Sequence, residues 1–294
     1  MSTIILGGGL LGHRLVCAGV RPCGAHDMHT DLTPRRWVDF AEIDNARDLG
    51  GLPVHGGGTT RFGVVYRSST PQQLSVADLD RLLGPMRLRT LIDLRMPGES
   101  AREGHGLLAK SAVRLINLPI STPVHTGPQH LGSDARHDEL LRLFGELLRG
   151  SAESVVAAAR LIADARHHAV LFHCAAGKDR TGILAAVLLD AIGVPATDIA
   201  ADYALTEHRL ARIRTRLIAL GSYPDLPPVR TGILAVLPAT MRGFLADLRA
   251  VHGGAARWLR ANGLTVTELT ALREVMVACG HDPAAPHCAA GSPR

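Results

Sequence analysis

The residues best suited to catalysis lie in one stretch, residues 173–182, which reads HCAAGKDRTG. Cys174 comes near its start, and Arg180 follows after five intervening residues. A guanidinium can bind two oxygens of a phosphate, and this spacing allows the cysteine sulfur to lie beneath the phosphorus. We therefore expect Cys174 to attack a phosphoryl group and form a phosphocysteine, with Arg180 stabilising the equatorial oxygens.

The flanking sequence predicts a strand, a tight loop and a helix around this stretch. Residues 169–172 form a short apolar run typical of a buried strand, and residues 183–192 are rich in Ala and Leu, as in a buried helix. A loop between them directs backbone N–H groups and the helix dipole toward one point, where an anion can bind. The residues predicted to bind phosphate are Cys174, Ala175, Ala176, Gly177, Lys178, Asp179 and Arg180.

Three neighbours of the nucleophile also receive roles. Thr181 can donate a hydrogen bond to the sulfur and make it a better leaving group when the phosphocysteine is hydrolysed. Lys178 is expected at the rim of the pocket, where it adds positive charge. His173 is expected to orient the loop by hydrogen bonding rather than to accept protons.

A second copy of part of the motif occurs at residues 287–294, which read HCAAGSPR. It repeats the interval from Cys to Arg, but no apolar run precedes it, and Pro293 lacks an amide that the loop would need. We therefore expect Cys288 to be inert. Sequence context, rather than spacing alone, singles out Cys174.

The run Cys-x-x-Gly-Lys-Asp-Arg-Thr-Gly resembles the signature of the atypical cysteine-dependent tyrosine and phosphoinositide phosphatases, a family that includes a mycobacterial enzyme. The resemblance covers about residues 40–278. Its further matching segments are residues 44–51 (DNARDLGG), residues 66–68 (YRS), and residues 93–95 (DLR) with Glu99. It implies a phosphomonoester hydrolase of the protein tyrosine phosphatase type, with phosphoinositide activity in addition.

The resemblance also bears on substrate binding. It implies that Lys178 favours multiply phosphorylated head groups, and that helices over about residues 207–238 cover the active site as a lid. Arg209, Arg212 and Arg216 share one face of a predicted helix in this region. That face is either solvated or part of the lid, where it would suit substrates that carry more than one anionic group.

The leaving oxygen needs a proton, and three carboxylates are candidates for the general acid. Asp179 comes first because the related mycobacterial enzyme is thought to hold its acid inside the loop. Asp93, at the end of a predicted strand, is second, and Asp134, in a long polar segment, is third. Alternatively, Asp179 takes no part in catalysis, and its negative charge only interacts favourably with the positive end of the helix dipole.

Alternating strand and helix patterns predict an α/β domain with a central, mainly parallel sheet flanked by helices, followed by a helical C-terminal part. The predicted strands span residues 61–66, 90–92, 113–118 and 169–172, and the helices before the motif span residues 75–83, 138–148 and 154–165. Local features expected are capping boxes at Ser75 and Thr265, an N-cap at Thr197 and an ion pair between Arg95 and Glu99. We expect a flexible extension over residues 1–39, a phosphatase domain over 40–279 and a disordered tail over 280–294.

The composition excludes several classes of protein. The chain has 294 residues, a net charge of +5 and a pI of about 9.3, which suits an anionic substrate or a solvated basic surface. It lacks the concentrated basic stripe of a nucleic-acid-binding protein. Five cysteines, an odd number without a framework pattern, favour a reducing compartment. No cysteine or histidine spacing predicts a metal site, and no cofactor is expected.

Residues 7–12 contain G-x-G-x-x-G, the pattern of a dinucleotide-binding turn, but no βαβ unit follows it. No segment has the length and apolar character of a membrane span, and no basic region precedes the apolar start as in a signal peptide. We expect a cytoplasmic protein without stable membrane insertion. Export without a signal peptide stays open.

Two functions other than that of a protein or phosphoinositide phosphatase also fit the motif. One is a phosphatase of a small phosphorylated metabolite, such as a nucleotide or sugar phosphate. The other is an inactive module that binds phosphate, which is disfavoured because Cys174, Asp179, Arg180 and Thr181 are all present. A rhodanese-type sulfurtransferase fits less well, since it needs no Arg-Thr-Gly at the start of its helix.

Overall fold

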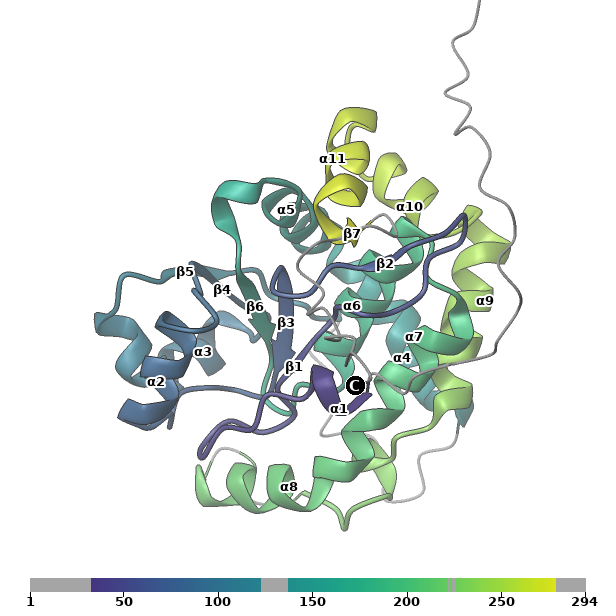
Figure 1. The fold of residues 1–294 in the computed structure, drawn as a ribbon. Coiled ribbons are helices and arrows are strands. Elements are labelled where there is room, and N and C mark those ends of the chain that lie inside the picture. Colours follow the sequence, from purple (N-terminus) through teal and green to yellow (C-terminus); the bar gives the residue numbers. More distant parts are fainter. Residues whose placement is uncertain (1–32, 123–136, 222, 224–225, 279–294) are drawn as a thin grey trace, which may run out of the picture. The chain divides into compact units, whose positions relative to one another are not determined.

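The computed structural model describes residues 33–122, 137–221, 223 and 226–278, all of which belong to one unit, Leu32–Arg294 (Figure 1). The described residues do not include Asp134, Cys288, most of the predicted N-terminal extension or any of the predicted tail. None of the helices in the described ranges is both long enough and apolar enough to cross a membrane.

A five-stranded sheet forms the centre, with the strand order β1-β3-β6-β4-β5. Its strands are β1 (Arg47–Asp48), β3 (Val65–Ser68), β6 (Val170–His173), β4 (Thr90–Asp93) and β5 (Arg114–Asn117). Only β1 runs antiparallel to its neighbour. The α/β fold with a mainly parallel sheet, predicted from the sequence, is therefore confirmed. A separate pair joins β2 (Thr59–Thr60) to β7 (Val277–Ala278).

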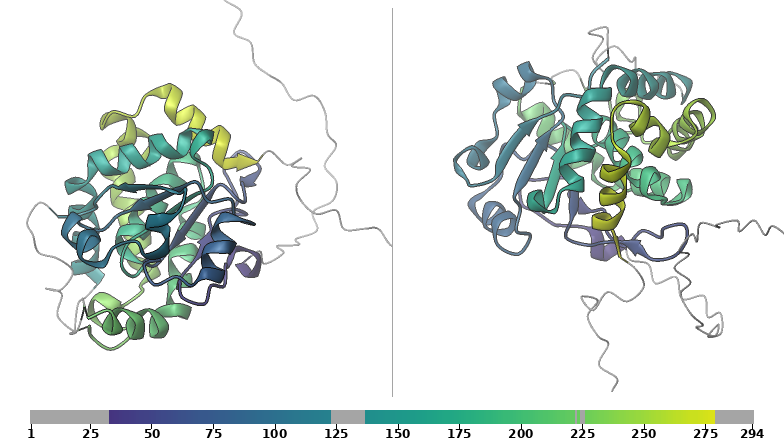
Figure 2. Two further views of the ribbon diagram at one scale, coloured as in Figure 1. Left: turned by 90° about the vertical axis from the view of Figure 1, so that its left-hand side faces the viewer. Right: turned by 90° about the horizontal axis from the view of Figure 1, so that it is seen from above.

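Helices cover both faces of the sheet, which Figure 2 shows edge-on. One face carries α2 (Val76–Leu83), α3 (Pro97–Glu103) and the 3₁₀ helix η1 (Gly106–Lys110). The other face carries α4 (His137–Gly150), α5 (Ala152–Ala163), α6 (Asp179–Ile192), α7 (Ala196–Ala204), α9 (Pro238–His252), α10 (Ala255–Ala261) and α11 (Val266–Met276). The remaining helices are α1 (Thr33–Arg36), η3 (Ala165–His167), η4 (Leu205–Arg209), α8 (Leu210–Ala219) and η5 (Gly232–Leu234).

The alternation of side chains along β6 explains why there are two cores. Val170 and Phe172 belong to the large core beneath α4 to α11, while Leu171 belongs to the smaller core beneath α2 and η1. All four residues of β6 are buried, as expected of a central strand in a parallel sheet. The helix that follows the motif, α6, is buried along most of its length because other helices surround it.

Several local expectations are confirmed. Ser75 accepts a hydrogen bond from the Asp78 amide at 3.1 Å and caps α2, and Thr265 caps α11 in the same way through Glu268. The last helix, α11, begins directly after Thr265, where the predicted capping box places its start. Local signals suffice here because each helix begins with its own side-chain cap or ends at a glycine or asparagine.

Two local expectations are wrong. The strand expected over residues 61–66 begins only at Val65, because positive φ angles at Gly58 and Gly63 bend the preceding chain away from the sheet. Thr197 is not the N-cap of α7; Pro195 holds that position without a side-chain hydrogen bond. The lid implied over about residues 207–238 stays a prediction; the described part of this segment contains the end of η4, α8, η5 and the first residue of α9.

Candidate active site

The predicted phosphate loop connects β6 to α6 at the carboxyl end of the central strand. β6 lies between β3 and β4, so side chains from the ends of both neighbours can reach the loop. Ligand sites in open α/β sheets occur at this end of the strands. The structure therefore places Cys174 and Arg180 where parallel-sheet enzymes commonly bind substrate.

Each backbone carbonyl of residues 174–177 lies within hydrogen-bond distance of a donor from a residue outside this stretch. The pairs are His173 Nδ1 with Cys174 O (3.1 Å), Thr70 N with Ala175 O (3.0 Å), Asn45 Nδ2 with Ala176 O (3.4 Å) and Asn45 Nδ2 with Gly177 O (2.9 Å). In a trans peptide the C=O and the following N–H point in opposite directions. Carbonyls held outward therefore turn the next N–H groups inward, which creates an anion-binding concavity.

Gly177 is required by the close approach of the loop to β3. Its φ is +67°, in the left-handed region, and a Cβ at this position would lie 2.4 Å from the carbonyl oxygen of Ser68. No side chain fits there without moving the end of β3. The turn that presents the amides thus depends on a glycine at this position.

The predicted nucleophile and the residue predicted to assist it are both buried. Cys174 is only 3 % exposed, and Thr181 is fully buried. The Thr181 Oγ1 has no hydrogen-bond partner among the described residues, which is uncommon for a buried hydroxyl. A hydroxyl without a protein partner is available to a sulfur, so this observation supports the role predicted for Thr181.

Arg180 is held by Glu99 of α3 in a two-point ion pair, with nitrogen to oxygen distances of 2.6 and 3.0 Å. The Tyr223 hydroxyl donates to the same carboxylate at 2.6 Å. Burial acts to raise the pKa of Glu99, but Arg180 outweighs it and lowers the pKa to about 2. Glu99 therefore stays charged and fixes the plane of the guanidinium.

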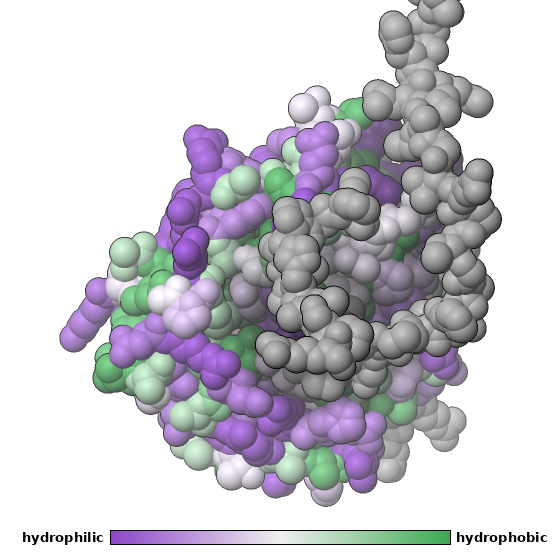
Figure 3. Space-filling view, in the orientation of Figure 1, coloured by the Kyte–Doolittle hydropathy of each residue, from purple (hydrophilic) through white to green (hydrophobic). Residues whose placement is uncertain are grey.

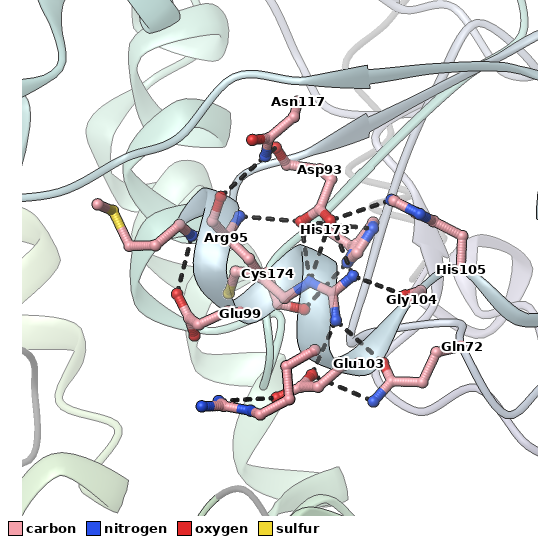
Figure 4. A network of polar contacts seen from close by, with 12 residues as sticks. Gln72, Asp93, Arg95, Glu99, Glu103, Gly104, His105, Asn117, His173 and Cys174 are labelled. Carbon is pink, nitrogen blue, oxygen red and sulfur yellow. Dashed lines mark hydrogen bonds and ion pairs between the residues drawn. The ribbon is translucent and has the colours of Figure 1, made fainter.

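The expected ion pair between Arg95 and Glu99 is wrong. Arg95 instead binds Asp93 at 2.8 Å and Glu103 at 2.8 Å, in the network that Figure 4 shows beside Cys174. Its guanidinium also donates to the Gly104 carbonyl at 3.0 Å. The sequence could not separate these pairings, because Glu99 and Glu103 are both close enough along the chain to reach Arg95.

Asp93 lies inside that network, 1 % exposed, with His105 Nε2 at 3.2 Å from its carboxylate (Figure 4). Burial acts to raise the pKa of Asp93, but His173, His105 and Arg95 lower it well below its usual range. Both Asp93 oxygens are occupied by Arg95 and His105, and its burial keeps the carboxylate away from a leaving oxygen at the mouth of the loop. The structure thus argues against Asp93 as a general acid and favours a part in holding the loop through Arg95 and His173.

Lys178 does not lie at the pocket rim, where it is expected from the sequence. Its side chain is 1 % exposed and points back into the domain, where it donates to Asp179 at 2.6 Å, to the Ala235 carbonyl at 3.0 Å and to Tyr203 at 3.4 Å. Burial acts to lower the pKa of Lys178, but Asp179 outweighs it and raises the pKa above its usual value. Lys178 therefore ties the start of α6 to α7 and η5.

The predicted basic helix is α8, and its two faces have different partners. Ile213 and Leu217 form a small buried cluster with Ala175 of the loop, and Tyr223 packs against the same cluster. The three arginines bind the segment before β1 instead, in the pairs Arg209–Asp39 (2.7 Å), Arg212–Asp44 (3.0 Å) and Arg216–Asp44 (2.9 Å). The surface over α8 is mainly hydrophilic (Figure 3). Its apolar face, rather than its charges, meets the loop.

Comparison with known proteins identifies the family. A model described as the tyrosine phosphatase family matches residues 38–278 of the chain. The chain belongs to the tyrosine phosphatase family. This membership accounts for the extent of the resemblance seen in the sequence, since both cover the strands, the loop and the C-terminal helices.

Two relatives illustrate this membership. A predicted tyrosine-protein phosphatase of Cupriavidus necator is 32 % identical over 231 residues, which cover 77 % of this chain and 84 % of that protein. The triple specificity protein phosphatase PtpB of Mycobacterium tuberculosis is 25 % identical, with 74 % of this chain and 92 % of PtpB covered. The core catalytic domain of the Saccharomyces cerevisiae phosphatase Siw14 aligns over 64 % of this chain and 90 % of its own, with 18 % identity and a TM-score of 0.37.

Sequence reasoning assigned no role to three residues that contact or support the loop. Asn45 and Arg67 donate to the Gly177 carbonyl, and Asp202 of α7 binds Arg67. Asn45 and Arg67 lie in segments that carry the family resemblance, which was the available signal. Asp202 lies far along the chain from Arg67, in a helix with no motif, and nothing in the sequence indicated it.

The two-point pair between Arg180 and Glu99 predicts a specific pH dependence of stability. The pKa of Glu99 is about 2 in the fold, against an ordinary value of 4.5 for glutamate. The ionised carboxylate therefore contributes its full stabilisation above pH 4.5, and this stabilisation is lost as the pH falls toward 2. We expect Glu99→Gln to lower the free energy of unfolding by about 3 kcal/mol near pH 6. The difference from wild type should shrink as the pH falls toward 3, as measured by denaturant unfolding.

The matched control is Glu42→Gln. The Glu42 side chain pairs with Arg216 but is itself 46 % exposed. An exposed pair contributes about 0–1 kcal/mol, so this variant should follow wild type across the range. A constant difference between Glu99→Gln and wild type at every pH would contradict the role assigned to the Glu99 charge.

Proposed function

We propose that this protein is a phosphomonoester hydrolase that works through a phosphocysteine on Cys174 and acts on aromatic esters such as phosphotyrosine. The observation that carries the proposal is the loop whose carbonyls are held outward around a buried cysteine. An inactive phosphate-binding module is a weaker proposal, since Cys174, Asp179, Arg180 and Thr181 are all present in the loop and at the start of α6.

The first step joins the Cys174 sulfur to phosphorus and breaks the bond to the leaving oxygen. Arg180 and the inward N–H groups stabilise the charge that develops on the equatorial oxygens. A water molecule then attacks the phosphocysteine, which releases inorganic phosphate and returns the thiolate. Thr181 supports this second step by donating a hydrogen bond to the departing sulfur.

Asp179 is the carboxylate that we propose as proton donor to the leaving oxygen. Its side chain is 16 % exposed at the start of α6, so it can reach the mouth of the loop, unlike buried Asp93. Lys178 holds one of its oxygens at 2.6 Å, which fixes the side chain and leaves the second oxygen for the substrate.

The preference for an aromatic ester follows from the side chains beside the loop. Ala175 meets the apolar face of α8, and Tyr223 packs against this cluster. The cations considered for binding further phosphates, Lys178 and the arginines of α8, are engaged by carboxylates of the chain itself. This arrangement favours a flat apolar leaving group and weakens the case for multiply phosphorylated lipids or metabolites.

The first prediction for this function concerns the nucleophile. Cys174→Ser should abolish release of phosphate from p-nitrophenyl phosphate, because a serine hydroxyl in this loop is not ionised at neutral pH. Vanadate should inhibit the wild-type protein. Cys288→Ser, which alters the second copy of the motif, is the control and should retain wild-type activity. Full activity in Cys174→Ser would exclude the proposed mechanism.

The second prediction concerns Asp179. Asp179→Asn should lower the rate by about 10²–10⁴-fold with substrates whose leaving groups are poor, because they need a proton in the transition state. The loss should be much smaller with an activated leaving group such as p-nitrophenolate. Asp93→Asn provides the comparison and should lower both rates together. An equal loss with both kinds of substrate in Asp179→Asn would assign Asp179 a structural role.

The third prediction concerns the substrate. Leu217→Ala should reduce the ratio of kcat/KM for a phosphotyrosine peptide to that for an inositol bisphosphate by about tenfold, because the buried cluster that supports Ala175 and Tyr223 beside the loop is loosened. The ratio cancels any loss of folded protein. Arg212→Ala, on the outer face of the same helix, should leave it unchanged. A selective loss of inositol bisphosphate activity in Arg212→Ala would support the multi-anion alternative instead.

A further inference from the structure

Asp202 of α7 lies at the centre of a buried cluster of three arginines. Its carboxylate binds Arg36, Arg47 with nitrogen to oxygen distances of 3.0 and 3.3 Å, and Arg67 at 2.6 Å. Asp202 is 1 % exposed, and none of the three guanidinium side chains is more than 5 % exposed. Burial acts to raise the pKa of Asp202, but Arg47, Arg36 and Arg67 lower it well below its usual range.

Positively charged groups outnumber the carboxylate in this cluster. Three guanidiniums share one carboxylate, which leaves an excess of two positive charges in the cluster. Burying charge is costly, and apolar side chains of similar volume often stabilise a core as well or better. The other hydrogen bonds of these arginines indicate what the charges do.

Two chains of hydrogen bonds lead from Asp202 to the same carbonyl of the phosphate loop. In the first, Arg67 binds Asp202 with one nitrogen and donates to the Gly177 carbonyl with another at 3.0 Å. In the second, Arg47 binds Asp202 and donates to the Asn45 side-chain oxygen at 2.6 Å, and the Asn45 amide donates to the Gly177 carbonyl at 2.9 Å. Both chains end on the peptide between Gly177 and Lys178.

The backbone conformation and the contacts of Asn45 indicate that its side chain is fixed in position. Its φ is +57°, which is uncommon for a residue other than glycine. Arg47 binds both its side-chain oxygen and its backbone carbonyl, and the Asn45 amide also lies 3.2 Å from the Thr206 hydroxyl. With its oxygen taken by Arg47, the amide nitrogen can only face the loop.

We propose that Asp202 is a positioning residue for the reaction: it aims Arg67 and, through Arg47, Asn45 at the Gly177 carbonyl, and so turns the Lys178 N–H toward the bound phosphate. This role rests on the proposed phosphatase function. It extends that function to a residue that touches neither the substrate nor the nucleophile.

Arg36 offers a matched control within the same cluster. It binds Asp202 as Arg67 does, and its Nε donates to the Asp48 carbonyl at 3.1 Å, but no hydrogen bond joins it to residues 174–180 of the described loop. Arg36→Met and Arg67→Met each remove one guanidinium and leave Asp202 paired with two others. Only Arg67→Met withdraws a donor from Gly177.

The test compares kcat, KM and vanadate inhibition in wild type, Arg36→Met and Arg67→Met, with thermal unfolding as the measure of folding. We expect Arg67→Met to lose about 10²-fold in kcat/KM, with a parallel loss of vanadate affinity, because a misplaced donor disturbs transition-state binding. Arg36→Met should keep its kcat/KM and vanadate affinity. Asn45→Gly, which tolerates the positive φ, acts on the same carbonyl and should reproduce the Arg67→Met effect if that variant folds poorly.

Equal losses in Arg36→Met and Arg67→Met, or unchanged vanadate affinity in both Arg67→Met and Asn45→Gly, would overturn the proposal. Failure of the phosphatase function gives a different result. A wild-type protein that binds vanadate but releases no phosphate, with binding weakened only in Arg67→Met and Asn45→Gly, would retain the positioning role and exclude the reaction. A wild-type protein that does not bind vanadate would exclude both.

Discussion

The site depends on the direction of four backbone carbonyls. Residues 174–177 would have no reason to turn every C=O outward without donors supplied by other elements, because an isolated loop would expose both its N–H and C=O groups to water. His173, Thr70 and Asn45 supply these donors from β6, from the segment after β3 and from the segment before β1. The inward direction of the N–H groups is therefore a property of the assembled sheet rather than of the signature sequence alone.

The charged residues around the loop act mainly on one another. Arg180 faces Glu99, and Lys178 faces Asp179. Arg209 of η4 faces Asp39, and the arginines of α8 face Asp44. Pairing of this kind fixes side chains in position before any ligand arrives, so little reorganisation is needed when charge develops on a phosphate. Because these cations are already paired, the basic pI of the chain does not indicate how many anionic groups a ligand would carry.

Much of the fold could be predicted because its signals are local. The capping boxes of α2 and α11, the apolar run of β6 and the Ala-rich α6 are each encoded within a few residues. The positions of Cys174 directly after β6 and of Arg180 at the start of α6 were predictable for the same reason, since one short motif contains both. Pairings over long distances were not, because Arg95 has two glutamates within reach and Asp202 meets Arg67 only after the chain has folded. Lys178 was misplaced because its direction depends on α7 and η5.

The contacts of Gly177 also constrain the order in which the protein can assemble. Its carbonyl is held by residues that precede it by 132 and 110 positions, and one of these, Arg67, is in turn held by a carboxylate on α7. During synthesis the signature motif therefore leaves the ribosome before the helix that completes its support. Contacts of such long sequence separation form late and slow the folding of a domain. A nascent chain that ends before α7 carries the whole catalytic motif but lacks one of the contacts that shape it.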